Sequence, residues 1–336
     1  MKKKGVLLVN LGTPDSTSVG DVRKYLREFL MDKRVIDIPT IPRWLLVNLI
    51  IATFRAPKSA AEYRKLFTER GSPLKYYTDD ITKLLQEDLA EEYVVEFAMR
   101  YQSPSIESGL KKLTEANVSQ IHVIPLFPQY ASASTGSVID KVMEIAKQWQ
   151  IIPDIKFTSQ FLEEELFLEV IAKKGKAWMD KTKYDHFVFS YHGLPERQIR
   201  KGSVGKQCQL GACCSSFHEK NRFCYRAQCF QTTRLLAEKL GLSEDQYTVC
   251  FQSRLGKDPW IQPYTDVVLR ELPKQGKKKV LAFSPAFVSD CLETTIEVGQ
   301  EYKHDFIEAG GEQWDLVESL NDDPTWIECL KVIAKS

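Results

Sequence analysis

Long apolar runs are scarce in this sequence of 336 residues. The longest, residues 44–54, falls well below the roughly 20 residues that a helix needs to span a membrane. The apolar run near the amino terminus is too short for a signal peptide and leads directly into Gly12, Thr13 and Pro14. We therefore expect neither a transmembrane helix nor an export signal, and we expect a cytoplasmic location.

An excess of one charge is also missing, because 46 Lys and Arg residues balance 45 Asp and Glu residues for a net charge of +1. A nucleic-acid-binding protein that relies on a broad basic face carries a large positive excess. The glycine-rich fingerprint of dinucleotide-binding folds is absent as well. We therefore expect no nucleic-acid partner and no nucleotide cofactor.

Short β-rich runs alternate with longer amphipathic segments, a pattern typical of parallel sheets covered by helices. The predicted strands are residues 5–11, 93–99, 120–127, 154–159, 185–191, 247–253, 278–283 and 314–320. Helical periodicity separates them, for instance over 78–91 and 105–116. Together with the chain length, this pattern predicts two α/β domains, residues 1–160 and 161–336, with a final helix that returns to the first domain.

One of only five histidines, His192, stands at the carboxyl end of the predicted strand 185–191, directly before Gly193. Ligands of open α/β sheets bind at the carboxyl ends of the strands. An imidazole held there can accept or return a proton near neutral pH. His192 is therefore a candidate catalytic base, and the alternative is a histidine that caps the strand through a backbone hydrogen bond.

Three carboxylates, Asp290, Glu293 and Glu297, follow the predicted strand 278–283. Glu293 and Glu297 are four residues apart and would share one face of an α-helix, as neighbouring oxygen ligands for a cation, with Asp290 one turn before them. A solvated acidic helix start is the alternative. Across a cleft from His192, these carboxylates would supply the base and the cation path that insertion of a metal ion into an organic ligand requires.

The segment 29–61 interrupts the alternation of strands and helices. Its bulky apolar residues lie close together, with Arg43 and Arg55 at either side. The segment is either a helix buried in the core or a lid over a flat hydrophobic ligand that also touches a membrane surface. Both interpretations stay open, and with them a peripheral membrane association.

Cysteine is concentrated in one place, since five of the eight cysteines follow Arg200 within about residues 201–229. They are Cys208, Cys213, Cys214, Cys224 and Cys229. In a chain without an export signal, such a group favours metal binding over disulfides, and four thiolates in one loop are typical of zinc or an iron-sulfur cluster. Because adjacent cysteines seldom bind one centre, the favoured ligands are Cys208, one of Cys213 or Cys214, Cys224 and Cys229. Cys229 is alternatively an ordinary packing thiol.

Seven sequence blocks in the same order resemble the ferrochelatases, and the resemblance runs from about Lys4 to the last helix. The blocks are residues 8–14, 71–74, 128–130, 190–195, 251–253, 259–260 and 287–290. The resemblance implies two Rossmann-like domains, each a parallel sheet flanked by helices, with the active-site cleft between them. It also implies insertion of Fe2+ as substrate into protoporphyrin IX to make protohaem.

The resemblance assigns roles to individual residues of this chain. His192 matches the catalytic histidine, and Glu293 and Glu297 match conserved glutamates, with His192 and Glu293 facing the Fe2+ substrate. Porphyrin-binding positions match Leu11, Arg55, Ser72, Arg100, Tyr101, Tyr130, Trp260 and Phe287. Many relatives have a second histidine where this chain has Cys291, so proton removal should not depend on a histidine pair. Some members carry a [2Fe-2S] cluster, which ranks that cluster above zinc for the cysteines.

Two other functions stay open at this point. One is a related chelatase that acts on coproporphyrin or inserts cobalt, although the apolar segment 29–61 favours a porphyrin with few carboxylates. The other is an iron-sulfur or haem-binding protein without catalysis, against which the presence of both His192 and Glu293 argues. The sequence leaves open whether the protein is a monomer or a homodimer, and from which face the iron enters.

Overall fold

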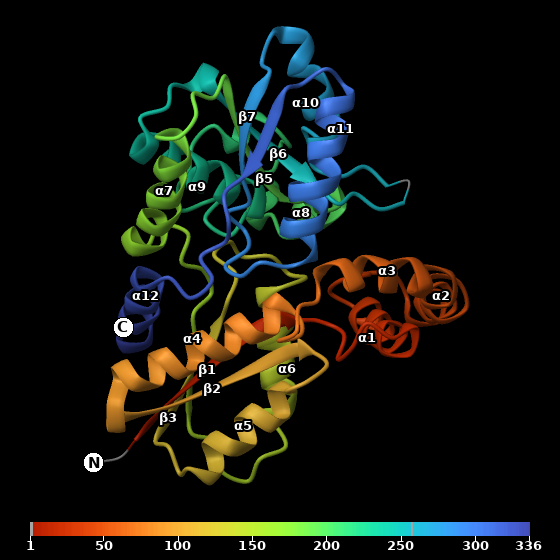
Figure 1. Ribbon diagram of the computed structural model, residues 1–336. Helices are drawn as coiled ribbons and strands as arrows, with labels where there is room; N and C mark the ends of the chain where they lie inside the picture. Colours follow the sequence, from red (N-terminus) through yellow and green to blue (C-terminus); the bar gives the residue numbers. More distant parts are fainter. Residues whose placement is uncertain (1–2, 257) are drawn as a thin grey trace. The chain divides into compact units, whose positions relative to one another are not determined.

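The computed structural model describes residues 3–256 and 258–336 as an α/β protein of two compact units (Figure 1). Unit 1 comprises the chain up to Phe127 together with Ser132–Gln160 and Ile327–Ser336. Unit 2 comprises Pro128–Ala131 and Phe161–Trp326. Each unit contains a parallel sheet flanked by helices, so the predicted fold class is confirmed.

The sheet of unit 1 has four parallel strands in the order β2-β1-β3-β4. The strands are β1 (Lys4–Gly12), β2 (Tyr93–Tyr101), β3 (Gln120–Pro125) and β4 (Asp154–Phe157). The helices beside this sheet include α1 (Val19–Met31), α4 (Pro73–Leu89), α5 (Ile106–Glu115) and α6 (Thr135–Ala146). The first strand is continuously apolar because both of its faces are buried.

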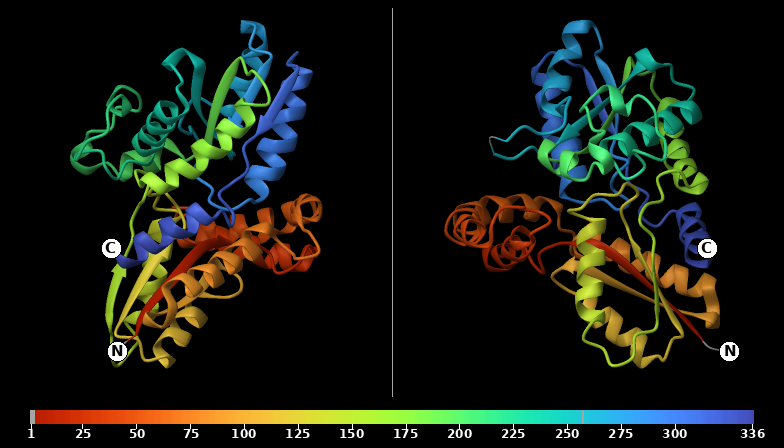
Figure 2. Two further views of the ribbon diagram at one scale, coloured as in Figure 1. Left: turned by 60° about the vertical axis from the view of Figure 1, so that its left-hand side comes forward. Right: turned by 180° about the vertical axis from the view of Figure 1, so that it is seen from behind.

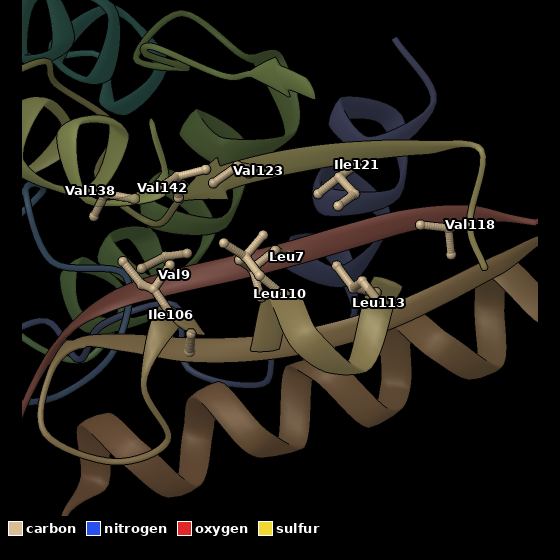
Figure 3. Packing of buried hydrophobic residues seen from close by; sticks show 11 residues of the cluster. Leu7, Val9, Ile106, Leu110, Leu113, Val118, Ile121, Val123, Val138 and Val142 are labelled. Carbon is tan, nitrogen blue, oxygen red and sulfur yellow. The ribbon is translucent and has the colours of Figure 1, made fainter. Parts of the chain in front are cut away.

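The core of unit 1 explains that apolar run. Leu7 and Val9 of β1 pack with Leu110 of α5 and Val138 of α6 on one face of the sheet (Figure 3). The alternate residues of the strand point to the other face and are equally buried. Since each buried Val or Leu side chain stabilises the fold by about 1.5–3 kcal/mol, the strand is held from both sides.

Unit 2 repeats the plan with the strand order β6-β5-β7-β8, again all parallel. The strands are β5 (His186–His192), β6 (Tyr247–Gln252), β7 (Lys279–Phe283) and β8 (Gln313–Leu316). The helices are α7 (Glu165–Met179), α8 (Glu196–Lys201), α9 (Tyr225–Leu240), α10 (Thr265–Glu271) and α11 (Tyr302–Glu308). Its core includes Val188, Cys250, Phe306 and Trp314.

All eight predicted strands occur among the described residues, but the last one is shorter than predicted. Strand β8 ends at Leu316, four residues before the predicted end. The chain then bends away from the sheet, and the backbone N–H of Ser319 donates to a carboxylate oxygen of Asp290 at 3.0 Å. The apolar pattern continues past Leu316 because Val317 and Leu320 stay buried outside the sheet.

The segment 29–61 contains the end of α1, then α2 (Thr40–Leu45), the π-helix η1 (Leu46–Ile51) and part of α3 (Ala52–Leu66). These helices form one group within unit 1 (Figures 1 and 2). Several bulky apolar side chains are about half or more exposed, namely Ile41, Trp44, Leu45, Leu49, Ile50 and Phe54. The structure therefore favours a surface segment over a core helix. No helix in the described part of the chain is long and apolar enough to cross a membrane.

Helix α12 (Pro324–Lys335) ends the chain, and its residues from Ile327 onward belong to unit 1. The Lys331 ammonium lies 3.9 Å from a carboxylate oxygen of Asp88 on α4. Near the end of the helix, the Ala334 carbonyl lies 3.4 Å from Nδ1 of His122 on β3. The carboxyl terminus is thus part of the unit that contains the amino terminus.

Candidate active site

His192 is the last residue of β5 and pairs with Gln252, the last residue of β6. The next residue, Gly193, donates its N–H to the Gln252 carbonyl at 2.8 Å. A Cβ at Gly193 would lie 2.8 Å from that carbonyl oxygen and 3.1 Å from the Trp260 ring, so only glycine fits this turn. The turn leaves the His192 imidazole half-buried at the carboxyl edge of the sheet.

The hydrogen bond of His192 determines its tautomer. Nδ1 lies 2.7 Å from the Gly193 carbonyl oxygen. Because a carbonyl oxygen can only accept, Nδ1 carries the hydrogen, and Nε2 of the neutral ring has the lone pair. The backbone hydrogen bond expected of a strand cap is therefore present, and it leaves Nε2 as the proton-accepting nitrogen.

Glu293 and Glu297 lie on η7 (Leu292–Glu301), which is a π-helix and not the α-helix that the sequence predicted. Its N–H groups bond five residues back, as from Tyr302 to the Glu297 carbonyl, so residues four apart still lie within one turn. The spacing of apolar residues does not distinguish the two helix types. Glu293 and Glu297 would therefore share a turn in an α-helix or in a π-helix.

Asp290 precedes the helix, so its predicted place one turn before Glu293 is wrong. One of its carboxylate oxygens accepts from the backbone N–H of Ser319 at 3.0 Å, and the other accepts from the Asn321 amide at 2.8 Å. The Asp290 N–H donates in turn to the Asn321 side chain at 2.9 Å. Asp290 therefore holds the loop after β8 against the start of η7.

Glu297 is half-buried and accepts three hydrogen bonds. The donors are the Ser253 hydroxyl at 2.6 Å, the Tyr302 hydroxyl at 2.9 Å and the Gln252 amide at 3.3 Å. Burial raises the pKa of Glu297, while the Ser253 hydrogen bond and the nearby charge of His192 lower it by less. A carboxylate with a raised pKa near an imidazole is a candidate partner for proton exchange.

The Ser253 backbone is strained, with φ of +66°. This left-handed conformation is uncommon for a residue with a side chain, and such residues cluster at functional sites. The conformation directs the Ser253 hydroxyl at Glu297. The sequence shows only a serine after a strand, which carries no sign of this geometry.

Cys291 is buried at the start of η7, and its thiol forms a hydrogen bond with the Glu293 side chain. Burial and the neighbouring Glu293 charge raise the pKa of Cys291 well above its usual value. Cys291 is therefore a neutral thiol at neutral pH. A neutral thiol does not accept a proton as a histidine does. This agrees with the expectation that proton removal does not depend on a histidine pair.

In unit 1, Leu11 and Tyr101 lie where β1 and β2 end, and Gly12 is paired with Tyr101. Gly12 has φ of +115°, and a Cβ there would lie 2.0 Å from the Tyr101 carbonyl oxygen, so the approach requires glycine. Leu11 is half-buried, and Arg55 on α3 is exposed. Ser72 is buried, and its hydroxyl has no hydrogen-bond partner among the described residues.

Arg100 and Tyr101 form a buried network around Asp32, which the sequence did not single out. An Asp32 oxygen accepts from Arg100 Nη2 at 2.7 Å, the Tyr101 hydroxyl at 2.9 Å and the Ser137 hydroxyl at 2.5 Å. Burial raises the pKa of Asp32, but hydrogen bonds from Ser137 and the Arg34 backbone, with the Arg100 charge, lower it by more. Tyr101 has no exposed surface, and its contact with a porphyrin stays a prediction.

The other predicted porphyrin positions lie in unit 2. The Trp260 ring is 6.5 Å from the His192 ring, and its indole N–H donates to the Leu255 carbonyl at 2.9 Å. Tyr130 packs edge-on against Phe223 of the Cys-rich segment at 5.7 Å. Phe287 is half-buried after β7. Of these residues, the structure brings only Trp260 next to His192.

Four of the clustered cysteines interact with one another. The Cys213 and Cys214 sulfur atoms are 4.0 Å apart, and both interact electrostatically with Cys208. Hydrogen bonds from the Cys214 thiol and from backbone N–H groups at the start of α9 lower the pKa of Cys224. A thiolate is the form that binds iron or zinc, and Cys224 is the thiol whose pKa is shifted toward that form, whereas burial raises the pKa of Cys208, and the hydrogen bond to Cys224 together with burial raises the pKa of Cys214.

Cys229 differs from these four. It is fully buried on α9, burial raises its pKa well above the usual value, and it forms a hydrogen bond with the Tyr225 hydroxyl. The structure therefore favours Cys208, Cys213, Cys214 and Cys224 over the set that includes Cys229. In residues 3–256 and 258–336, no three His, Cys, Asp or Glu side chains are arranged to hold a metal ion as they stand. The four thiols match a cluster in number, and the Cys213 and Cys214 sulfur atoms lie 4.0 Å apart.

Comparisons with known proteins identify the family of the chain. The family model for ferrochelatase matches residues 3–336. A ferrochelatase of Legionella pneumophila (strain Lens) is 46% identical over 331 residues, covering 98% of each chain. One of Coxiella burnetii (strain Dugway 5J108-111) is 43% identical over 338 residues, covering 99% of this chain and 93% of the relative.

Solved structures with similar folds have much lower identity. SirB from Bacillus subtilis with Fe3+ has a TM-score of 0.53 at 13% identity and covers 99% of this chain and 94% of its own. This similarity supports the two-unit fold alone. The family model and the curated relatives cover nearly the whole chain. The chain therefore belongs to the ferrochelatase family and is a metal chelatase of the lyase class.

Proposed function

We propose that this protein inserts Fe2+ into protoporphyrin IX to make protohaem. The observation that carries the proposal is the hydrogen bond from His192 Nδ1 to the Gly193 carbonyl, which reserves Nε2 for a proton. The half-buried carboxylate of Glu297 interacts electrostatically with the same imidazole. In this proposal, His192 is the first proton acceptor and Glu297 is the second.

The proton balance of the reaction assigns work to both groups. Two pyrrole N–H protons leave the porphyrin for each Fe2+ that enters. In our proposal, His192 Nε2 takes a pyrrole proton, and Glu297, which has a raised pKa, takes up protons from the imidazole. The Glu293 carboxylate, held by the Cys291 thiol, faces the iron substrate.

The exposed apolar side chains of residues 41–54 suit a flat hydrophobic ligand. Covering them removes apolar surface from water, which contributes about 25 cal/mol per Å². In our proposal, this binding energy is spent on bending the porphyrin, so that the pyrrole nitrogens become accessible. Arg55 directly follows Phe54 in the sequence and is exposed on α3. Its guanidinium suits a propionate group of the porphyrin. The same apolar surface also suits contact with a lipid headgroup layer.

We further propose that Cys208, Cys213, Cys214 and Cys224 hold a [2Fe-2S] cluster. When bound, the cluster supplies a one-electron centre and a closure for the loop. The support is the lowered pKa of Cys224 and the proximity of the other three sulfur atoms. The loop is short and polar, so it gains order from a bound metal centre.

The cluster assignment is tested by visible absorption and metal analysis of anaerobically purified variants. Cys224→Ser should lose the colour, whereas Cys229→Ser should keep it, because Cys229 is fully buried on α9 and forms a hydrogen bond with Tyr225. Zinc in place of iron and sulfide would overturn the cluster assignment. Loss of colour in Cys229→Ser alone would restore the set favoured from the sequence.

The catalytic proposal is tested by an anaerobic insertion assay that follows the porphyrin absorption bands. Protoporphyrin IX with Fe2+ should give protohaem faster than coproporphyrin with Fe2+ or protoporphyrin with Co2+. A preference for either alternative pair would replace the proposed substrate. A protein that binds protohaem tightly but metallates no porphyrin would be a binding protein and not a chelatase.

A further inference from the structure

Tyr225, which has no place in the mechanism above, contacts the backbone of the proposed base. Its hydroxyl donates to the His192 carbonyl oxygen at 2.9 Å. The side chain is buried, so this hydrogen bond is shielded from competing water. This contact joins residues that are 33 positions apart in the sequence.

The same tyrosine is attached to the Cys-rich segment 208–224. It is the first residue of α9, directly after Cys224, which is the N-cap residue of that helix. The Cys224 sulfur accepts from backbone N–H groups of the first turn and interacts with the Cys214 thiol. One turn further along, the Cys229 side chain hydrogen-bonds to the Tyr225 hydroxyl. The position of Tyr225 therefore depends on the helix start at which the thiols gather.

The His192 carbonyl oxygen lies in the turn that orients the His192 imidazole, so a hydrogen bond to this oxygen affects the position of the ring. His192 ends β5, and its ring bonds to the Gly193 carbonyl, so the direction of the imidazole follows the orientation of the peptide planes around it. The peptide group between His192 and Gly193 is held at both of its polar atoms. Its N–H donates to the Gln252 carbonyl, and its carbonyl oxygen accepts from the Tyr225 hydroxyl. A shift of about 1 Å in a catalytic group can cost about a hundredfold in rate.

We propose that Tyr225 is a positioning residue for His192 and that it couples the Cys-rich segment to iron insertion. The inference rests on the proposed function, since His192 is taken as the base. Tyr225 touches neither the porphyrin nor the iron in this proposal. It acts through the His192 backbone, so its effect belongs to turnover and not to porphyrin affinity.

The first test is Tyr225→Phe, which removes the hydroxyl and keeps the buried ring. We expect kcat to fall about tenfold with the KM for porphyrin unchanged. Hydrogen-deuterium exchange should become faster at the amides of residues 192–197. The matched control is Tyr184→Phe, which deletes a hydroxyl that donates to Asp315 at 2.7 Å in the same unit. The control should leave kcat and that exchange unchanged.

The second test is a double-mutant cycle between Cys224→Ser and Tyr225→Phe. If Tyr225 carries the coupling, Cys224→Ser alone speeds exchange at residues 192–197, and adding Tyr225→Phe has no further effect. Fully additive effects on exchange and kcat would overturn the coupling. Unchanged exchange and kcat in Tyr225→Phe would overturn the positioning role.

These outcomes are separable from failure of the proposed function. A wild-type protein that metallates no porphyrin would sink the proposed function. The exchange measurement would still decide whether Tyr225 restrains the His192 turn. The visible absorption of Tyr225→Phe should match the wild type, because Tyr225 supplies no ligand to a cluster.

Discussion

The two sheets have the same strand order, yet their carboxyl edges differ in chemistry. In unit 1, the polar side chains at the edge, Arg100 and Tyr101, are neutralised by Asp32 in a buried network. In unit 2, His192 keeps a nitrogen with a free lone pair, and the half-buried Glu297 has a raised pKa. The charge at the first edge is balanced, whereas the second edge has the groups that our proposal uses for proton transfer. The same fold therefore supports two different tasks, and the side chains at the strand ends decide which.

The largest expected effect is that of removing the base in unit 2. His192→Ala should lower the rate of iron insertion by about 10²–10⁴-fold, the usual contribution of a general base, while the melting temperature stays near that of the wild type. The assay is anaerobic metallation of protoporphyrin IX. His304→Ala is the control, since that histidine is exposed on α11 and pairs with Glu308. Rapid insertion by folded His192→Ala would show that another group is the base.

The network in unit 1 should respond to mutation through stability. Asp32→Asn leaves the Arg100 guanidinium buried without its counter-charge, which should lower the free energy of unfolding by about 3 kcal/mol. Chemical denaturation measures this loss. Asp15→Asn is the control, because Asp15 forms only an outer 3.7 Å ion pair with Lys24, worth at most about 1 kcal/mol. Equal losses in the two variants would mean that the network does not stabilise unit 1.

Each unit also contains a buried histidine, His122 in unit 1 and His186 in unit 2. We expect the two to make the free energy of unfolding depend on acid pH to different extents. Burial lowers the pKa of His186 to about 4, and its Nδ1 has no hydrogen-bond partner among the described residues. Since the unfolded chain binds the proton near pH 6.5, the unfolded state gains protons first as pH falls. Stability should therefore drop between about pH 6.5 and pH 4, by about 2 kcal/mol after allowance for solvent screening.

The corresponding variants separate the two histidines. His186→Gln should remove most of that acid-dependent loss, as followed by urea denaturation at several pH values. His122→Gln should remove less, because the Ala334 carbonyl near its Nδ1 can accept from the charged ring and partly offsets the effect of burial. A larger effect at His122 would contradict the role of that carbonyl.

The smallest effect concerns the strained backbone in unit 2. Ser253→Ala and Ser253→Gly both remove the hydroxyl that donates a hydrogen bond to Glu297. Because such a bond contributes about 1 kcal/mol, both variants should lower turnover several-fold. Glycine also relieves the positive φ, so Ser253→Gly should be about 1 kcal/mol more stable than Ser253→Ala. Full activity in the glycine variant would show that strain, and not the hydroxyl, limits the wild type.

The features that can be predicted from the sequence are those that depend on a local pattern of residues. The eight strands follow from apolar runs bounded by turn residues, and His192 is conspicuous because it follows such a run directly. The cysteine segment is conspicuous through density alone. These signals need no knowledge of distant residues.

Features that depend on distant partners were missed. Asp32 meets Arg100 across 68 positions, and Tyr225 meets His192 across 33. Neither residue lies in a motif, although an acidic residue directly after the apolar end of α1 is a weak signal for Asp32. The π-helical geometry of η7 was missed because α- and π-helices present nearly the same apolar spacing.

The path of the chain through the units has a consequence for synthesis. Unit 1 is interrupted in the chain by most of unit 2, because Ile327–Ser336 belong to unit 1 and follow Phe161–Trp326 of unit 2. A nascent chain can form the sheet of unit 1 early, but the carboxyl-terminal turns that contact Asp88 and His122 arrive only after all of unit 2 has been made. The surface of unit 1 that these turns cover therefore stays uncovered until unit 2 has been translated.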